Sequence, residues 1–169
     1  MSKIDTVTQE YVKKVLHYNP ETGIFTWLAT CSNRAVKGSI VSCTDPHGYI
    51  CLRVNNVNVR AHRLAYLYIV GKWPDNYIDH INGNTSDNRW VNLRHVTSAV
   101  SSKNKGICKR CRFGLMGIDI AHGKYRVRIR DKGKEVHLGL YVDFFEACCA
   151  RKSAESKYNY HPNHGRQKW

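Results

Sequence analysis

The sequence predicts an α+β fold, built from short antiparallel strands and a few helices. Three observations indicate this class. Residues 49–60 alternate in polarity around a turn signal, which is typical of a β-hairpin, and "AHRLAYLYIV" directly after them has helical spacing. Residues 114–141 contain three further strand-like segments, and a helical segment follows them. A chain of 169 residues suits one compact domain or two small ones.

The N-terminal elements follow from local signals. Residues 8–16 are expected to form a short helix, with Thr8 as its N-cap. Pro20 and Gly23 mark a turn, and residues 24–28 are rich in strand-forming side chains. The region therefore predicts helix, turn and strand in this order.

A hairpin and a second helix are expected next. Residues 49–54 and 57–60 flank Asn55 and Asn56, which suit a tight turn because asparagine tolerates positive φ. The helical run after them ends at Gly71, a residue type common just beyond helix C-termini.

The last third predicts a three-stranded antiparallel sheet packed on one helix. In "KYRVRIR", Val127 and Ile129 alternate with arginines, so period two places aliphatic and basic side chains on opposite faces. These arginines are Arg126, Arg128 and Arg130. The helix that follows has Asp143 as a candidate N-cap, and Ala147 and Ala154 at helical spacing allow it to lie close to the apolar face.

Charge indicates the class of partner. The chain has 27 Lys and Arg against 13 Asp and Glu, a net charge of +14, and a positive field of this size favours nucleic acid. No apolar run approaches the roughly 18 residues of a membrane span, and the N-terminus lacks the apolar core of a signal peptide. The 7 cysteines show no framework spacing, so we expect reduced thiols in a cytoplasm.

Residues 97–114 are polar and small, with several basic side chains. They predict a linker that lies along phosphates, or an ordinary solvated linker. Cys108 and Cys111 form a CxxC pair, but no second pair completes four ligands, so structural zinc is not expected.

The segment "IDHINGNTSDNRWVNLRHVTSAVSSKN" suggests chemistry. A metal-dependent nuclease needs oxygen ligands for a hard cation and a base that activates water. Asp79 supplies a carboxylate, and His80 titrates in the range that suits a general base. Adjacent side chains of a strand point to opposite faces, so the two serve one site only if the backbone bends, and "INGN" offers that bend.

Other polar residues nearby have simpler expected roles. His62 and Arg63 begin a helix and are expected to pack or pair within the domain, with a phosphate contact from Arg63 as the alternative. Four residues are expected to satisfy backbone groups as loop and cap residues: Asn82, Asn84, Asp87 and Asn88.

The string from "AHRLAY" through "DH", "DN", "NLR" and "T" resembles the HNH endonucleases of the phage homing type, and "YNPETGIFTW" resembles the start of their domain. The resemblance covers about residues 18–104 and implies a ββα-metal fold that cuts double-stranded DNA with one divalent ion, Mg²⁺ or Mn²⁺. It implies that His80 is the general base, that Asp79 is a metal ligand, and that Asn92 holds the motif together and orients the histidine.

The third motif position departs from the family. It falls on Ser101, four residues after Thr97, where relatives usually have Asn or His as a metal ligand. Three alternatives are open. Ser101 binds the metal through a water, Asn104 substitutes from the next turn, or the metal site is impaired.

The C-terminal third resembles the APETALA or ethylene-response-factor DNA-binding domain, through "KYRVRIR", "HLGLY" and "EACCARKSAE". The resemblance implies that the sheet lies in the major groove and that its arginines contact DNA. The residues expected to contact bases or phosphates are Arg126, Arg128, Arg130, Lys124, Lys132 and Lys134, with Lys103 and Lys105 before the sheet.

These observations predict a site-specific DNA endonuclease with a cutting domain at residues 1–105 and a DNA-binding domain at residues 106–169. The alternative is a catalytically impaired HNH-fold protein that binds DNA at specific sequences. An RNA-binding protein is disfavoured because neither part offers an aromatic stacking platform. We expect no membrane contact, no obligate protein partner, and a location in the cytoplasm of the host cell if the protein is phage-encoded.

Overall fold

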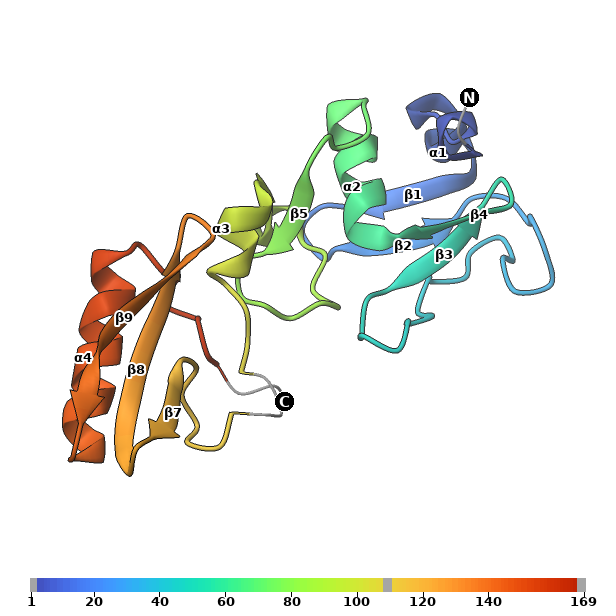
Figure 1. The fold of residues 1–169 in the computed structure, drawn as a ribbon. Helices are drawn as coiled ribbons and strands as arrows, with labels where there is room; N and C mark the ends of the chain where they lie inside the picture. The colour runs from blue at the N-terminus through green and yellow to red at the C-terminus, as the bar shows by residue number, and fades with distance from the viewer. Residues whose placement is uncertain (1–2, 108–110, 167–169) are drawn as a thin grey trace. The chain divides into compact units, whose positions relative to one another are not determined.

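A computed structural model describes residues 3–107 and 111–166 of the chain (Figure 1). Contacts divide the chain into two compact units, Met1–Val96 and Thr97–Trp169. No helix of the described part is long and apolar enough to cross a membrane. The mixed helices and small antiparallel sheets agree with the predicted α+β class.

The N-terminal unit consists of short helices and three separate two-stranded antiparallel pairs, β1–β2, β3–β4 and β5–β6. Its elements are η1 (Lys3–Thr6), α1 (Gln9–Val15), β1 (Leu16–Asn19), β2 (Ile24–Trp27), β3 (Cys51–Val54), β4 (Val57–Arg60), α2 (Ala61–Val70), β5 (Tyr77–His80), η2 (Trp90–Asn92) and β6 (Leu93–Val96).

The helix α1 confirms the first predicted element, and Thr8 caps it by accepting a hydrogen bond from Tyr11 N at 3.2 Å. Leu16, however, does not belong to the helix. It begins β1, a strand that local signals did not predict, and pairs with Trp27 of β2. The conformation of Leu16 is decided by its pairing with Trp27, which becomes its neighbour only when the chain folds.

The predicted hairpin and second helix are confirmed. Asn55 and Asn56 have φ of 45° and 61°, as a tight turn between β3 and β4 requires. The helix α2 ends at Gly71, which has φ of 87° and donates its N–H to Leu67 O. The core of this unit packs side chains from α1, α2 and the strands β1 to β4, and includes Leu16, Phe25 and Leu64.

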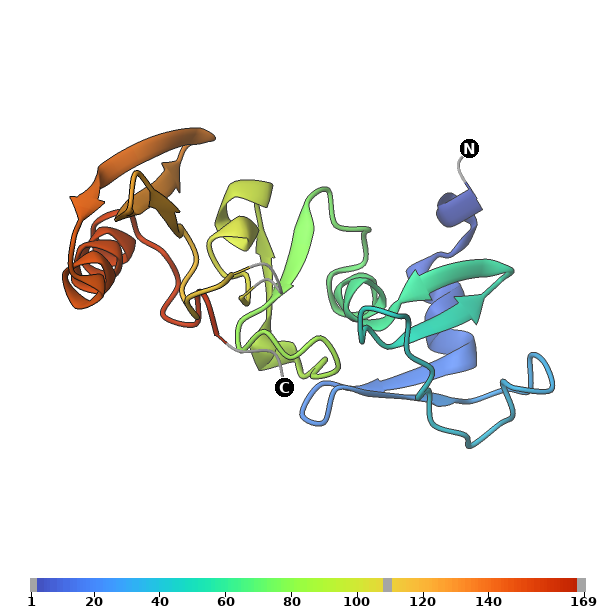
Figure 2. The ribbon, with the colours of Figure 1, turned by 60° about the horizontal axis from the view of Figure 1, so that its bottom comes forward.

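The C-terminal unit contains α3 (Ser98–Ser102), β7 (Ile118–Ala121), β8 (Lys124–Asp131), β9 (Lys134–Tyr141) and α4 (Phe144–Lys157). The strands form one antiparallel sheet in the order β7-β8-β9, and α4 runs along one face of it (Figures 1 and 2). The prediction of three strands and one packed helix is therefore confirmed.

The two faces of β8 separate as period two predicts. Val127 is fully buried in a core that includes Ala147 of α4, and Ile129 is also buried. Asp143 caps α4 by accepting a hydrogen bond from Glu146 N at 2.9 Å. The arginines of β8 consequently lie on the sheet face that α4 does not cover.

Part of the segment expected to be a linker forms backbone hydrogen bonds within the C-terminal unit. Lys103 O accepts from His161 N at 3.1 Å, and Lys105 O accepts from Gly165 N at 2.9 Å. Ile107 N likewise donates to Arg166 O at 2.9 Å, so residues 103–107 pair with the C-terminal tail. Cys108 of the CxxC pair lies outside the described residues.

Arg151 is a buried charge that joins three parts of the C-terminal unit. Its side chain is 3% exposed and forms an ion pair with Glu155 Oε1 at 3.1 Å. Its Nη1 donates to Arg128 O of the sheet at 2.7 Å, and its Nη2 lies 3.3 Å from His164 Nε2 of the tail. Removing this side chain therefore leaves several buried polar groups without their partner.

We predict that Arg151→Ala lowers the free energy of unfolding of this unit by about 3 kcal/mol, the usual cost of breaking a buried ion pair from one side. The matched control is Lys152→Ala, because Lys152 also contacts Glu155 but is 52% exposed. It should cost about 0.5 kcal/mol. Hydrogen exchange of residues 118–157 measures both, and equal effects would contradict the structural role of Arg151.

Candidate active site

The strand pair β5–β6 presents the two residues expected to carry the chemistry. Asp79 lies opposite Arg94 in the antiparallel register, and His80, the last residue of β5, lies opposite Leu93. The backbone turns directly after His80, where Gly83 N donates to His80 O at 2.9 Å. The bend expected at "INGN" is therefore present.

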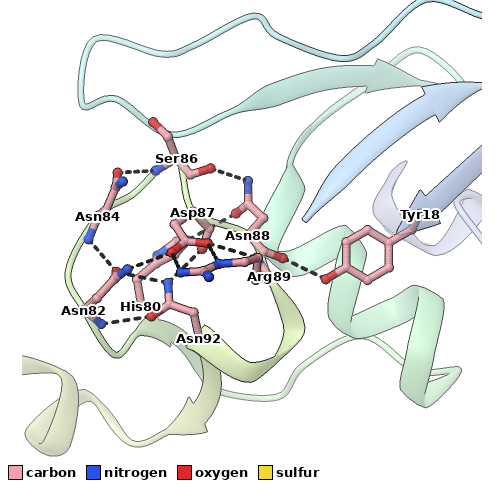
Figure 3. A network of polar contacts seen from close by, with 9 residues as sticks. All are labelled: Tyr18, His80, Asn82, Asn84, Ser86, Asp87, Asn88, Arg89 and Asn92. Atoms are coloured by element: carbon pink, nitrogen blue, oxygen red, sulfur yellow. Dashed lines mark hydrogen bonds and ion pairs between the residues drawn. The ribbon is translucent and has the colours of Figure 1, made fainter. Parts of the chain in front are cut away.

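Asn92 closes the loop that follows His80 (Figure 3). Its Oδ1 accepts from Asn82 N at 2.9 Å, and its Nδ2 donates to Asn82 Oδ1 at 3.0 Å and to Asp87 O at 2.8 Å. The expected loop roles of Asn82, Asn84 and Asp87 are confirmed, because the side chain of each accepts a hydrogen bond from a backbone N–H. The donors are Asn84 N, Ser86 N and Arg89 N, respectively. Hydrogen bonds from Arg89 lower the pKa of Asp87 to about 2.

The turn between β1 and β2 supports the same loop from outside. Tyr18 Oη donates to Asn88 O at 2.7 Å, and Trp90 N donates to Pro20 O at 2.9 Å. A Cβ on Gly23 would lie 2.4 Å from Asn88 C and Arg89 N, so a side chain there would displace the loop. The "YNPETG" segment thus serves as a platform for the residues around His80.

His80 is held almost completely inside the unit, with 3% of the residue exposed. Its Nε2 lies 3.1 Å from Asn88 Oδ1, and Asn88 Nδ2 donates to Ser86 O at 3.4 Å. With the amide oriented by Ser86, Asn88 Oδ1 accepts from Nε2–H, so neutral His80 carries its lone pair on Nδ1. Asn88 is therefore more than the loop residue that we expected, since it fixes the tautomer of the candidate base.

Two aromatic rings surround His80. Its ring centroid lies 5.0 Å from that of His62, in an edge-to-face arrangement, and 5.9 Å from that of Tyr49. His62 is 5% exposed, and its Nδ1 has no hydrogen-bond partner among the described residues. Burial lowers the pKa of His62 to about 3, and burial also lowers the pKa of His80. Both rings are therefore neutral at neutral pH.

His62 and Arg63 do pack and pair within the domain. Arg63 donates to backbone oxygens of Pro74 and Asn76, at 3.3 Å and 3.4 Å. Tyr49 and Asn88 are the site residues that sequence reasoning missed. Asn88 stands in the "DN" of the motif string, but nothing in its local sequence distinguishes it from the neighbouring loop asparagines.

Asp79 is paired with a cation of the protein itself. Arg94 donates to Asp79 Oδ2 from Nη2 at 2.8 Å and from Nε at 3.2 Å. The two side chains are 14% and 28% exposed, so water screens this ion pair only partly. A cation at Asp79 must therefore displace Arg94 from Oδ2 or use the other carboxylate oxygen.

The carboxylate of Asp79 fits a hard cation that takes its other ligands from outside the protein. Mg²⁺ commonly takes one or two carboxylates and completes its shell with waters and phosphate oxygens. Asp79 provides one carboxylate, and the described residues contain no group of three or more His, Cys, Asp or Glu side chains that could hold a metal alone. A cation at Asp79 would therefore need further oxygen ligands from water or from a bound phosphate group.

Ser101 lies on α3 in the C-terminal unit, whereas Asp79, His80 and Asn92 lie in the N-terminal unit. Its neighbour Asn104 is 2% exposed, and Arg166 Nη1 donates to Asn104 Oδ1 at 3.1 Å and to Asn104 O at 2.7 Å. The side-chain oxygen of Asn104 is therefore already engaged, which argues against this residue as the substitute ligand.

The expected DNA-contacting residues fall into two groups. Arg126 and Arg128 bind acidic side chains of the sheet, and Lys103 Nζ donates to Tyr158 O at 2.6 Å and lies 3.4 Å from Asp131. The others are exposed: Lys105, Lys124, Arg130, Lys132 and Lys134.

Comparison with known proteins relates the central part of the chain to a nuclease family. Residues 59–103 match the family model described as HNH endonuclease. The matched segment runs from β4 to α3 and contains Asp79, His80, Asn92 and Ser101. No curated protein and no solved structure matches the chain. The family match supports an HNH nuclease domain that acts on DNA.

The buried neutral His62 predicts acid sensitivity. Its folded pKa lies below the unfolded value of 6.5, so the unfolded chain binds the extra proton as pH falls from 6.5 towards 3. The contribution of His62 to stability is fully present above pH 6.5 and is lost as the pH falls below that value. Between pH 7 and pH 5 this loss is about 2 kcal/mol. The charged or titratable neighbours are His80, Arg60, Arg63 and Asp45.

We expect His62→Leu to reduce the pH dependence of unfolding by that amount. Urea unfolding at pH 7 and pH 5, followed by the fluorescence of Trp27, Trp73 and Trp90 in this unit, measures it. An unchanged pH dependence in the variant would show that His62 does not remain neutral in the fold.

Proposed function

We propose that the protein is a metal-dependent, site-specific DNA endonuclease of the homing type. The observation that carries the proposal is the family match at residues 59–103 around a histidine locked by Asn88 at the end of β5. The net charge of +14 supports DNA as the substrate.

His80 acts as the general base in the proposed reaction. Because its Nε2–H is held by Asn88, the Nδ1 lone pair takes the proton from the attacking water, which adds in line to phosphorus. Asp79 would hold a Mg²⁺ or Mn²⁺ ion, which when bound stabilises negative charge on the phosphate and on the leaving 3′ oxygen. The bond between phosphorus and the 3′ oxygen breaks, solvent protonates that oxygen, and the products are a 5′-phosphate and a 3′-hydroxyl.

The sheet of the C-terminal unit would select the DNA site, as an APETALA-type domain does. The sheet face opposite α4 carries Arg126, Arg128 and Arg130, Lys132 lies in the β8–β9 turn, and Lys134 begins β9. The exposed basic side chains, Arg130 among them, suit phosphates, whereas the guanidinium groups of Arg126 and Arg128 suit base edges.

A second candidate function is sequence-specific DNA binding without cleavage. Two observations favour it. The third motif position is Ser101, and the one carboxylate of the motif is engaged by Arg94. A serine hydroxyl is a weaker ligand for a hard cation than an amide or carboxylate oxygen.

The nuclease proposal predicts that the chain nicks supercoiled plasmid with Mg²⁺ or Mn²⁺. His80→Ala should reduce the rate at least 100-fold, since positioned acid–base groups contribute about 10²- to 10⁴-fold. His17→Ala is the matched control, because His17 is exposed on β1 of the same unit. Equal rates for wild type and His80→Ala would refute the assignment of the base.

The same assay separates the two candidate functions. DNA binding without nicking at any metal concentration would favour the second candidate. If Ser101→Asn then restored nicking, the defect would lie in the third ligand position alone.

The Arg94–Asp79 ion pair predicts an effect on metal binding that needs no cleavage. Arg94→Gln removes a positive charge that opposes the cation, so Mn²⁺ should bind several-fold more tightly in the absence of DNA. Arg53→Gln changes the net charge equally from an exposed position on β3. Calorimetric titration gives both affinities, and an equal change in the two variants would indicate only a general charge effect.

A further inference from the structure

Asp119 of β7 binds two of the arginines that face away from α4. Arg126 donates to Asp119 Oδ1 from Nε at 2.9 Å and to Oδ2 from Nη2 at 2.7 Å. Arg128 Nη2 donates to the same Oδ2 at 2.7 Å. One carboxylate therefore fixes two guanidinium groups from the neighbouring strand, one of them in a planar two-bond arrangement.

A second acid completes the group on the other side. Arg128 Nη1 donates to Glu135 Oε1 of β9 at 2.9 Å. Asp119, Arg126, Arg128 and Glu135, here called the acid–arginine cluster, thus span all three strands. Asp119 and Arg126 are direct partners in the antiparallel register, which places them on the same face of the sheet.

The cluster remains accessible. The side chains of Asp119, Arg126 and Arg128 are 37%, 38% and 31% exposed, so a ligand can reach the guanidinium edges that the carboxylates do not use. Arg126 directs two of its five N–H donors to Asp119, which leaves three, including both on Nη1, to bind elsewhere. The buried Arg128 Nε has no hydrogen-bond partner among the described residues. An arrangement that leaves this donor unsatisfied is poorly explained by stability alone.

The charges within the cluster cancel, and this changes what the arginines can do. Two arginines against two acids exert little net attraction on a phosphate backbone. Attraction to the phosphate backbone comes instead from the exposed basic residues around the cluster, which are Lys124, Arg130, Lys132 and Lys134. An arginine that is already oriented loses less side-chain freedom when it forms the paired hydrogen bonds that read guanine.

We propose that Asp119 is a specificity-determining positioning residue. It holds Arg126 and Arg128 in the orientation in which they read base edges, and it cancels their sequence-independent attraction to phosphate. This inference rests on the proposed DNA-binding function of the sheet. It separates the expected DNA contacts of the sheet into two groups. Arg126 and Arg128, held by acids, read bases, and the exposed residues Lys124, Arg130, Lys132 and Lys134 contact phosphates.

The test is selection of bound duplexes from a random-sequence library by the full chain in EDTA, which prevents cleavage. Wild type should enrich a defined motif, and Asp119→Asn should reduce that enrichment at least tenfold. The variant should bind a random duplex several-fold more tightly at low salt, with a steeper salt dependence equivalent to about one or two additional phosphate contacts. A residue with only a structural role would not weaken selectivity and strengthen random binding together.

The matched control is Asp75→Asn, which raises the net charge equally from an exposed position with only a 3.9 Å ion pair to Lys72. It should leave the enriched motif unchanged. Glu135→Gln, which releases only one contact of Arg128, should reduce enrichment less than Asp119→Asn does.

The outcomes that overturn the inference are distinct from those that overturn the proposed function. If wild type enriches a motif and Asp119→Asn enriches it equally, Asp119 is an ordinary surface acid. If wild type binds duplexes but enriches none, the sheet has no specificity for Asp119 to determine. If wild type binds no duplex at low salt, DNA binding itself fails, and the inference fails with it.

Discussion

The side-chain amide of Asn92 is the constraint on which the candidate active site depends. The loop between β5 and β6 contains few apolar side chains that could fix its shape by burial, so hydrogen bonds must do so. Asn92 bonds Asn82 on one side and Asp87 on the other, and this places Asn88 against His80. The turn at Gly23 then holds the loop from outside. The orientation of the candidate base is therefore set by residues that take no part in the chemistry.

Both candidate sites keep their important charges paired. Acids are scarce in a chain with 13 Asp and Glu against 27 Lys and Arg, yet one holds Arg94 in the N-terminal unit and another holds Arg126 and Arg128 in the C-terminal unit. In the N-terminal unit, the Arg94–Asp79 pair opposes the binding of a cation at Asp79. In the C-terminal unit, pairing with Asp119 opposes non-specific contact of Arg126 and Arg128 with phosphate. In the C-terminal unit the paired arginines keep other N–H donors for a ligand, whereas a cation at Asp79 must displace Arg94 or use the other carboxylate oxygen. Both pairings therefore favour a correctly placed phosphate or base over a random one.

Local signals predicted those elements that depend on neighbours in sequence. The caps at Thr8 and Asp143, the Asn55–Asn56 turn and the alternation of β8 are all decided within a few residues. The motif string also led to His80 and Asp79. What local signals missed is decided by distant partners. Leu16 becomes a strand residue because Trp27 pairs with it, and residues 103–107 are ordered by the C-terminal tail. Neither the Arg94 contact nor the Asp119 contact follows from spacing, because both require the register between strands.

In the proposed reaction, water activated by His80 attacks phosphorus and expels the 3′ oxygen. Cleavage of a duplex in ¹⁸O-labelled water, followed by mass spectrometry of the new ends, shows which atom the water attacks. We expect one ¹⁸O atom in a 5′-phosphate for each cut and an unlabelled 3′-hydroxyl. Label in a 3′-phosphate, or a 5′-phosphate without label, would contradict it, because a different bond would then break or a different nucleophile would attack.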